Sequence, residues 1–333
     1  IPLRLVGSEM CIRDSVSPEG MKNLLVEYQR CASSGSYNLV DKVLRVPVKK
    51  NQQKFNLWEQ SVLVHELTHT LQGQVIDLAG WYEDMKERDD FSPYAGRRSI
   101  MEAQADLVQA RWESNLDQYD RTEMNSQQPN FTCRVELPSY FYIPNELYYS
   151  FGPQLVKQIN TLGGMEAINA ALYELPTAEQ VYAPEKYFSG ELYQDIQIEN
   201  LIIGDYELIK EGTIGALDIP YILQDTIGRV ASVQAAIGIG GGAWKDYVDS
   251  SQRLMMSVKM SGDTPTDLNE IFSAYSAWAN AQNRFTDKQS FAGGTLYIGD
   301  TNVWISTDGD YVRIVLTQEL EVFNEIFSQI NSF

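Results

Sequence analysis

The stretch Val62-Leu-Val-His-Glu-Leu-Thr-His-Thr-Leu-Gln72 contains both histidines of the chain, His65 and His69, with Glu66 directly after the first. The run is apolar and suits a helix, on which residues four apart lie on the same face. Two imidazoles placed in this way can reach one Zn²⁺, and the glutamate between them can hold a water on that metal. We therefore expect a helix over 57–75 with His65 and His69 as zinc ligands and Glu66 as general base.

A catalytic zinc takes three protein ligands and keeps one position for water. Because the chain has no third histidine, the third ligand is expected to be a carboxylate, or failing that a cysteine. Glu102 is the best candidate, since it lies 33 positions after His69 in a helical pattern over 98–119. Asp106, one turn further on, can accept a hydrogen bond from a ligating histidine. Three other glutamates are rival ligands: Glu83, Glu87 and Glu113.

Composition places the chain among globular proteins. It has 333 residues, of which 44% are hydrophobic and 21% charged, which is enough for one large or two ordinary domains. The formal net charge of −19 argues against a nucleic-acid partner, because phosphate requires a cationic surface. No apolar run approaches the length of a membrane span.

Residues 1–15 are interpreted as an artefact. Met10-Cys-Ile-Arg-Asp14 matches the in-frame translation of a transposon-type sequencing adapter, so this segment is excluded from fold reasoning. The native start is then lost, and a signal peptide or a membrane anchor at that end stays open. Without Cys11, the chain keeps Cys31 and Cys133, which suit one disulfide in an exported protein or two buried thiols.

The predicted fold class is α+β and mainly helical, with a core over 16–195 and an α+β region over 196–333 packed on it. Before the histidine motif, 39–48 is rich in β-branched residues and predicts a strand, whose edge could pair with an extended peptide. Asn56 followed by Glu59 predicts a capping box at the start of the motif helix.

The C-terminal region predicts both helices and strands. Gly238–Gly242 is interpreted as a tight turn that ends a helix, and Asp308-Gly-Asp310 as a hairpin turn. The acidic residues Asp263, Asp267 and Glu270 are interpreted as the start of a helix. The expected helices cover 146–162, 165–174, 205–236, 243–258, 265–283 and 319–330. The expected strands cover 295–298, 302–306 and 311–316.

The pattern H-E-L-T-H-x-L-Q, followed by a helix with E-x-x-A-D, resembles the gluzincins, the thermolysin-like zinc metallopeptidases whose third ligand is glutamate. More narrowly, it is similar to an uncharacterised prokaryotic gluzincin-like group whose members are often exported or lipid-anchored. That group tends to carry a Tyr-x-x-Gly helix, then Gly-Gly, then a Pro-Glu-Lys-Tyr turn. The chain has these pieces in the same order, at Tyr149–Gly152, Gly163-Gly164 and Pro184–Tyr187.

The resemblance implies a thermolysin-like core and a secreted or extracytoplasmic zinc metallopeptidase acting on a peptide or protein substrate. Carried over by position, His65, His69 and Glu102 are the zinc ligands. Glu66 is the general base that takes a proton from the zinc-activated water, and Asp106 supports a ligating histidine.

Ala183 departs from the group, in which a histidine is expected before the Pro-Glu-Lys-Tyr turn. If that histidine stabilises the transition state, a tyrosine replaces it here or catalysis is impaired. Tyr148, Tyr149 and Tyr187 are the candidates by position. Two alternatives to a peptidase follow, namely a zinc-stabilised binding or surface protein without catalysis and a zinc hydrolase of a non-peptide amide.

Overall fold

The computed structural model describes residues 18–32, 35–38, 41–46, 48, 52–81, 83, 92–129, 137 and 139–330. Their contacts divide them into two compact units, one up to Pro176 and the other from Thr177 onward. The domain boundary that the sequence predicts, after residue 195, differs from this one. Residues 177–195 belong with the second unit because Gln194 N donates to Gly240 O over 2.7 Å, on a strand of that unit's sheet.

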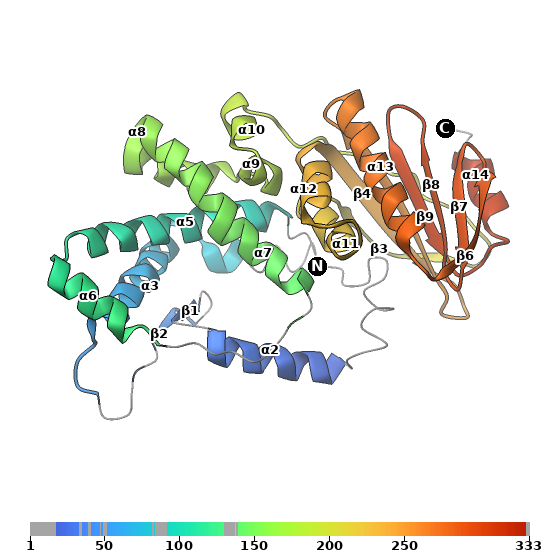
Figure 1. The fold of residues 1–333 in the computed structure, drawn as a ribbon. Coiled ribbons are helices and arrows are strands. Elements are labelled where there is room, and N and C mark those ends of the chain that lie inside the picture. Colours follow the sequence, from blue (N-terminus) through green and yellow to red (C-terminus); the bar gives the residue numbers. More distant parts are fainter. Residues whose placement is uncertain are drawn as a thin grey trace. The chain divides into compact units, whose positions relative to one another are not determined.

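The first unit is helical apart from a short hairpin. Its longest helices, α3, α5 and α8, form the body of the unit, with α5 packed against both of the others (Figure 1). The helices are α2 (Pro18–Ala32), α3 (Leu57–Val75), α5 (Ser92–Ser114), α6 (Gln118–Gln127), α7 (Ile143–Glu146) and α8 (Gly152–Glu174). A 3₁₀ turn, η1 (Ser139–Tyr142), and a π-helical segment, η2 (Leu147–Phe151), complete it. The expected zinc helix and the expected glutamate helix are therefore neighbours.

Helix α3 begins and ends as its sequence predicts. The Asn56 side chain accepts from Glu59 N over 2.8 Å, and the Glu59 carboxylate accepts from Asn56 N over 2.9 Å, which forms the predicted capping box. Such a cap satisfies amide groups that the first turn leaves without partners. The start of the helix fixes which residues face α5, and His65 and His69 are among them.

One expected helix boundary is corrected and one expected break is confirmed. The helix expected over 98–119 is α5, which ends at Ser114, because Asp117 caps α6 through its hydrogen bond from Asp120 N. The break expected at Gly163-Gly164 is confirmed as a kink inside α8, where Gly164 has a left-handed φ of 64°. Glycine adopts this conformation without strain, so the chain changes direction there as the sequence predicts.

The strand expected over 39–48 is shorter in the structure. Only Val43–Arg45 forms a strand, β2, and it pairs antiparallel with β1 (Ser36–Asn38). Residues 39, 40 and 47 lie outside the described residues, as do Cys133, Glu87 and the side chain of Cys31. Among the helices that the structure describes, none has the length and hydropathy for a bilayer crossing.

The second unit is built on a seven-stranded antiparallel sheet with strand order β3-β4-β5-β9-β8-β7-β6. The α+β class expected from the sequence is thereby confirmed. Its strands are β3 (Glu207–Thr213), β4 (Ile239–Val248), β5 (Leu254–Gly262), β6 (Phe285–Phe291), β7 (Gly294–Gly299), β8 (Asn302–Thr307) and β9 (Val312–Thr317). Its helices are α9 (Ala178–Tyr182), α10 (Pro184–Ser189), α11 (Asp218–Ile227), α12 (Arg229–Ile237), α13 (Pro265–Ala281) and α14 (Phe323–Ile330).

Both faces of this sheet are covered. Helix α13 contacts four of the strands (Figure 1). Residues of alternate strand positions pack against α14 and against the irregular segment 191–203, which we call the strap. The resulting apolar cluster includes Leu201, Ile203, Tyr247, Met255, Trp304, Val315, Phe323 and Phe327.

The helices expected at the start of 205–236 and over 243–258 are wrong, because these segments are β3, β4 and the beginning of β5. Residues 239–247 of β4 are all buried, so both faces of this strand are covered. A strand buried on both faces lacks the alternation of apolar and polar residues that identifies a strand in the sequence, and the length of the segment does not separate it from a helix. Strand β6 was not expected either. The strands expected over 295–316 are confirmed as β7, β8 and β9, with Gly309 at φ 97° in the turn.

The glycine run at 240–242 lies in β4 and not in the expected turn. A Cβ on Gly241 would lie 2.1 Å from the backbone oxygen of Gln194 in the strap. Glycine is needed here because the strap passes too close for any side chain. Of the acidic residues expected to start the next helix, Asp267 does so by forming a capping box with Thr264 at the start of α13. Asp263 instead forms an ion pair with Lys186.

Candidate metal centre

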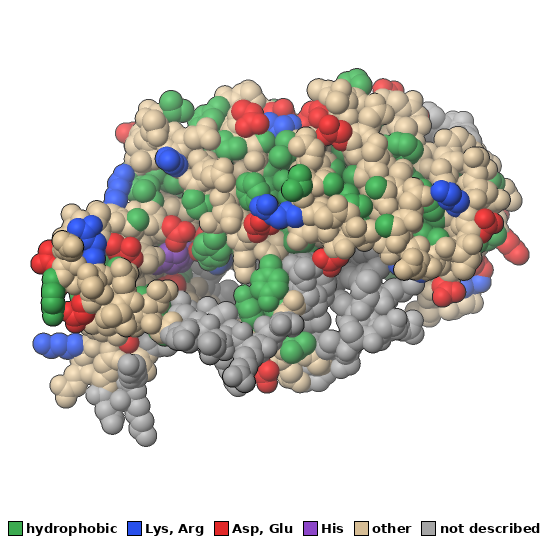
Figure 2. Space-filling model, viewed as in Figure 1, with side chains coloured by type: hydrophobic (Ala, Val, Ile, Leu, Met, Phe, Trp, Pro, Cys, Tyr) green, Lys and Arg blue, Asp and Glu red, His purple; other side chains and the backbone are tan. Residues whose placement is uncertain are grey.

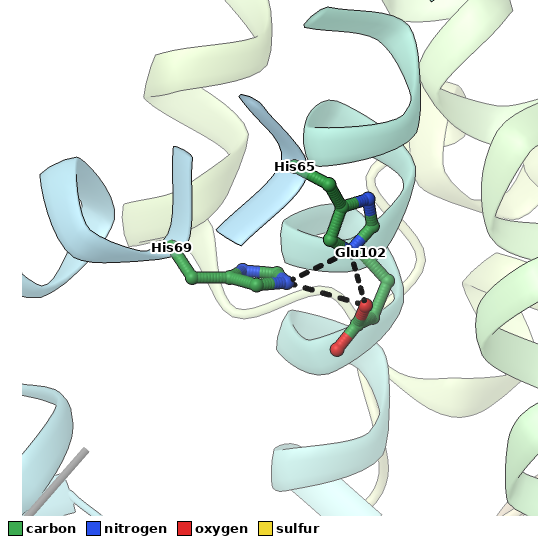
Figure 3. Close-up of side chains that lie close together, drawn as sticks. All are labelled: His65, His69 and Glu102. Carbon is green, nitrogen blue, oxygen red and sulfur yellow. Dashed lines mark hydrogen bonds and ion pairs between the residues drawn. The ribbon is translucent and has the colours of Figure 1, made fainter. Parts of the chain in front are cut away.

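His65 and His69 project from α3 towards Glu102 on α5 (Figure 3). The two histidine Nε2 atoms lie 3.1 Å apart, and each lies 3.4 Å from Oε2 of Glu102. The imidazole rings are nearly perpendicular, at 81°. Three donor atoms from two helices thus converge on one point.

The donor set and its spacing suit zinc. Ligand atoms about 2.0–2.1 Å from a tetrahedral ion lie about 3.3 Å from one another, which matches the measured separations. Two imidazole nitrogens with one carboxylate oxygen form a set found at catalytic zinc sites, whereas Mg²⁺ and Ca²⁺ take oxygen ligands. With three protein donors, a tetrahedral ion would keep its fourth position for water.

The far nitrogens of both imidazoles are held by acceptors. His65 Nδ1 lies 3.2 Å from Oδ1 of Asp106, and His69 Nδ1 lies 2.8 Å from Oε1 of Gln72. A proton on each Nδ1 leaves both Nε2 lone pairs free for a metal. The structure therefore places Asp106 where the sequence predicts a supporting carboxylate.

Gln72 is itself fixed by a buried network. Its amide nitrogen donates to Met101 O over 3.0 Å and to Oε1 of Gln104 over 2.8 Å. The amide oxygen can then only face His69, so the tautomer of that imidazole follows from the network. Gln104 continues it by donating to Oδ1 of Asn169 over 2.7 Å, which connects α3, α5 and α8.

Glu102 is 1% exposed, and its negative charge is stabilised by neighbouring side chains. Arg98 Nη2 lies 2.6 Å from Oε1, and the Tyr149 hydroxyl donates to Oε2 over 2.8 Å. Burial alone would raise the pKa of Glu102, but the Arg98 charge and the hydrogen bonds of the two histidines hold it well below its usual range. The carboxylate is thus ionised and available as a ligand.

Glu66 is buried on α3, between the two histidines in sequence. Burial raises the pKa of its carboxyl, although the neighbouring His69 and His65 oppose this effect. Its side chain lies against Gly35, at which a Cβ would approach Oε1 of Glu66 to 3.0 Å. The loop before β1 therefore confines the expected general base.

One edge of the cluster is partly exposed. Histidine side-chain atoms are visible on one face of the molecule, next to acidic side chains (Figure 2). The side chain of His65 is 14% exposed and that of Asp106 40%. The edge of the cluster formed by His65 and Asp106 is therefore in contact with solvent, while Glu102 is buried.

Two of the rival glutamates lie outside the cluster, and one of the candidate tyrosines belongs to the other unit. Glu83 is exposed, and Glu113 accepts hydrogen bonds from Ser61 and from Gln109, the latter over 3.1 Å. Tyr187 is on α10 in the second unit, where its ring lies 5.3 Å from Phe188. The first unit thus brings together only Tyr149 and Tyr148 of the three tyrosine candidates, with their rings 6.5 Å apart.

Three residues of the centre were not predicted in their roles, namely Arg98, Gly35 and Gln72. Arg98 precedes Glu102 by one helical turn, which is a spacing that permits an ion pair. Gln72 follows His69 by three positions on α3, which is likewise a spacing that permits contact. Gly35 acts through a contact between separate elements and offers no such signal.

Comparison with known proteins gives no relative. No protein-family model, curated protein or solved structure matches the chain.

Proposed function

We propose that the chain is a zinc-dependent metallopeptidase of gluzincin type, with a thermolysin-like pairing of the α3 and α5 helices. One observation carries the proposal: Nε2 of His65, Nε2 of His69 and Oε2 of Glu102 lie 3.1–3.4 Å from one another. Glu66 follows the first ligand directly in the chain. This arrangement supports hydrolysis by an activated water more than it supports a purely structural site, because structural zinc sites are closed by four protein ligands.

A zinc ion held by these residues would supply a water whose pKa is lowered to roughly 7. Glu66 would take a proton from this water and pass it to the leaving amine. A buried carboxylate with a raised pKa suits this exchange, since a general base works best with a pKa near the working pH.

Tyr149 is the candidate to stabilise the oxyanion. Its hydroxyl donates to Oε2 of Glu102 over 2.8 Å, so it is next to the donor atoms, and its single proton would turn from Glu102 to the oxyanion. The residue is 48% exposed. Desolvation of the hydroxyl, the largest effect, and the Glu102 charge raise the pKa of Tyr149, so the phenol stays protonated as a donor. With alanine at 183 and no third histidine in the chain, a tyrosine donor is what the first unit offers.

The test compares wild type with Glu66→Gln. Zinc content is measured by atomic absorption after dialysis, and hydrolysis is measured on casein and on a mixed quenched-fluorescence peptide library. We expect about one zinc per chain in both proteins and turnover in wild type alone. Glu166→Gln, on the exposed side of α8, is the matched control and should behave as wild type.

Equal activity in wild type and Glu66→Gln would refute the role of Glu66. Zinc in both proteins with no turnover of any peptide would favour the zinc-stabilised binding protein instead. The absence of zinc from wild type would refute the metal centre itself.

A further inference from the structure

Both oxygens of Glu102 are held by other side chains. Oε1 faces the Arg98 guanidinium at 2.6 Å, and Oε2 accepts from the Tyr149 hydroxyl at 2.8 Å. Only Oε2 also faces the two histidines. The carboxylate therefore presents one oxygen to the metal position while the other is paired with a cation.

Arg98 is in turn fixed by an aromatic support. Its Nη1 donates to the Tyr94 hydroxyl over 3.1 Å, and the Tyr94 ring stacks on Trp81 with centroids 4.7 Å apart. One terminal nitrogen of the guanidinium, Nη1, thus contacts Tyr94, and the other, Nη2, contacts Glu102. A planar group with both terminal nitrogens engaged has little freedom to release the carboxylate.

We propose that Arg98 is a positioning residue that makes Glu102 a one-oxygen ligand and so preserves the fourth metal position for water or substrate. The inference rests on the metal centre of the proposed function and not on peptide hydrolysis. It assigns Arg98 a part in metal binding although Arg98 does not touch the metal position itself.

The physical reason is the choice that a free carboxylate has. A carboxylate can bind a cation through one oxygen or through both, and the second oxygen would add a fifth ligand that crowds the position a catalytic zinc keeps for water. The ion pair at Oε1 removes that choice. Outer partners of this kind typically change metal affinity roughly 10–100-fold when they are removed.

A competing effect has the opposite sign. The positive charge of Arg98 also repels a divalent cation, so an arginine that acted by charge alone would weaken metal binding. Removal of Arg98 then distinguishes the two roles, because lost positioning lowers zinc affinity and lost repulsion raises it.

The experiment uses the full chain, stripped of metal, with Arg98→Met, Arg98→Lys and Arg111→Met. Arg111 is the matched control, since it is exposed near the end of the same helix and binds Asn160 instead. Zinc affinity is measured by competition with a chromogenic chelator. The visible spectrum of the Co²⁺-loaded protein reports coordination number independently of activity, because four-coordinate cobalt absorbs more strongly than five-coordinate cobalt.

We expect Arg98→Met to bind zinc roughly 10–100-fold more weakly than wild type and to lose intensity in its cobalt spectrum. Arg98→Lys keeps the positive charge but lacks the planar guanidinium, so its zinc affinity should lie between those of wild type and Arg98→Met. It also serves as the test if Arg98→Met does not fold. Arg111→Met should match wild type. Unchanged or tighter zinc binding by both Arg98 variants, or an unchanged cobalt spectrum, would overturn the inference and leave the proposed function standing.

Tyr94→Phe tests the support behind Arg98. If Tyr94 acts through Arg98, its effect on zinc affinity should vanish in an Arg98→Met background, as a double-mutant cycle reveals. Independent, additive effects would overturn the link between Tyr94 and Arg98. Failure of wild type to take up zinc would overturn the inference together with the metal centre.

Discussion

Replacing Gly35 by alanine should impair the general base without touching a metal ligand. A Cβ at this position would lie 2.9 Å from Cγ1 of Val62 and 3.0 Å from both Cγ and Oε1 of Glu66. Ordinary contacts between such atoms are about 3.5–4.0 Å, so the Glu66 side chain must move by roughly 0.5–1 Å. A misplacement of about 1 Å in a catalytic group can lower the rate roughly 10²-fold.

The assay separates the steps that depend on Glu66 from those that do not. We expect kcat for a fluorogenic peptide to fall roughly 10²-fold, with KM and zinc content near the wild-type values, because the ligands are undisturbed. Gly73→Ala is the matched control. It also adds a methyl group between α3 and the β1 hairpin, but its Cβ would meet Tyr37 at 3.3 Å and not Glu66.

Full activity in Gly35→Ala would refute the reasoning, since it would mean that the position of Glu66 does not matter or that the loop yields freely. Equal losses in Gly35→Ala and Gly73→Ala would also refute it, because the effect would then come from the hairpin as a whole. A loss of zinc in Gly35→Ala would show that the substitution damages the ligands.

Three further changes test other parts of the structure. Gln72→Leu removes the acceptor that orients one imidazole and should weaken zinc binding roughly 10–100-fold, measured by chelator competition. Burial raises the pKa of Glu179 to about 9, although the Lys186 ammonium lies 3.0 Å away. Because this lies above the unfolded value of about 4.3, the folded chain keeps a proton that the unfolded chain has lost, and stability falls as pH rises from about 4.3 to 9. Glu179→Gln should flatten that decline in urea unfolding. Gly241→Ala would set a Cβ 2.1 Å from Gln194 O and should destabilise the second unit by roughly 1–3 kcal/mol, measured by denaturant unfolding.

Each of these has an outcome that contradicts it. Unchanged zinc affinity in Gln72→Leu would show that the imidazole does not need its acceptor. A wild-type stability curve that rises between pH 5 and 9, or one that Glu179→Gln leaves unchanged, would show that Glu179 is not protonated in the folded chain. Wild-type stability in Gly241→Ala would show that the strap is not held against β4.

Local signals in the sequence predicted those helix ends and breaks that depend only on neighbouring residues. The Asn56 and Glu59 cap predicts the first turn of α3 because a capping box involves only neighbouring residues. The Gly163-Gly164 pair predicts the break in α8 for the same reason. Strand β4 was misassigned because burial on both faces removes the alternation that identifies a strand. Strand β5 does alternate, at Met256–Ser261, and the helix assignment overlooked that signal.

Sequence reasoning alone predicts the donor set of the candidate metal centre. Spacing on one helix brings His65 and His69 together, and the lack of another histidine calls for a third ligand of a different type, which favours Glu102. The spacing of Arg98 and Glu102 on α5 permits their ion pair, but the structure shows which carboxylate oxygen receives it and which one faces the histidines. Gly35 against Glu66 joins segments 31 positions apart. A contact of that second kind has no spacing rule, because packing between elements and not helical periodicity brings the atoms together.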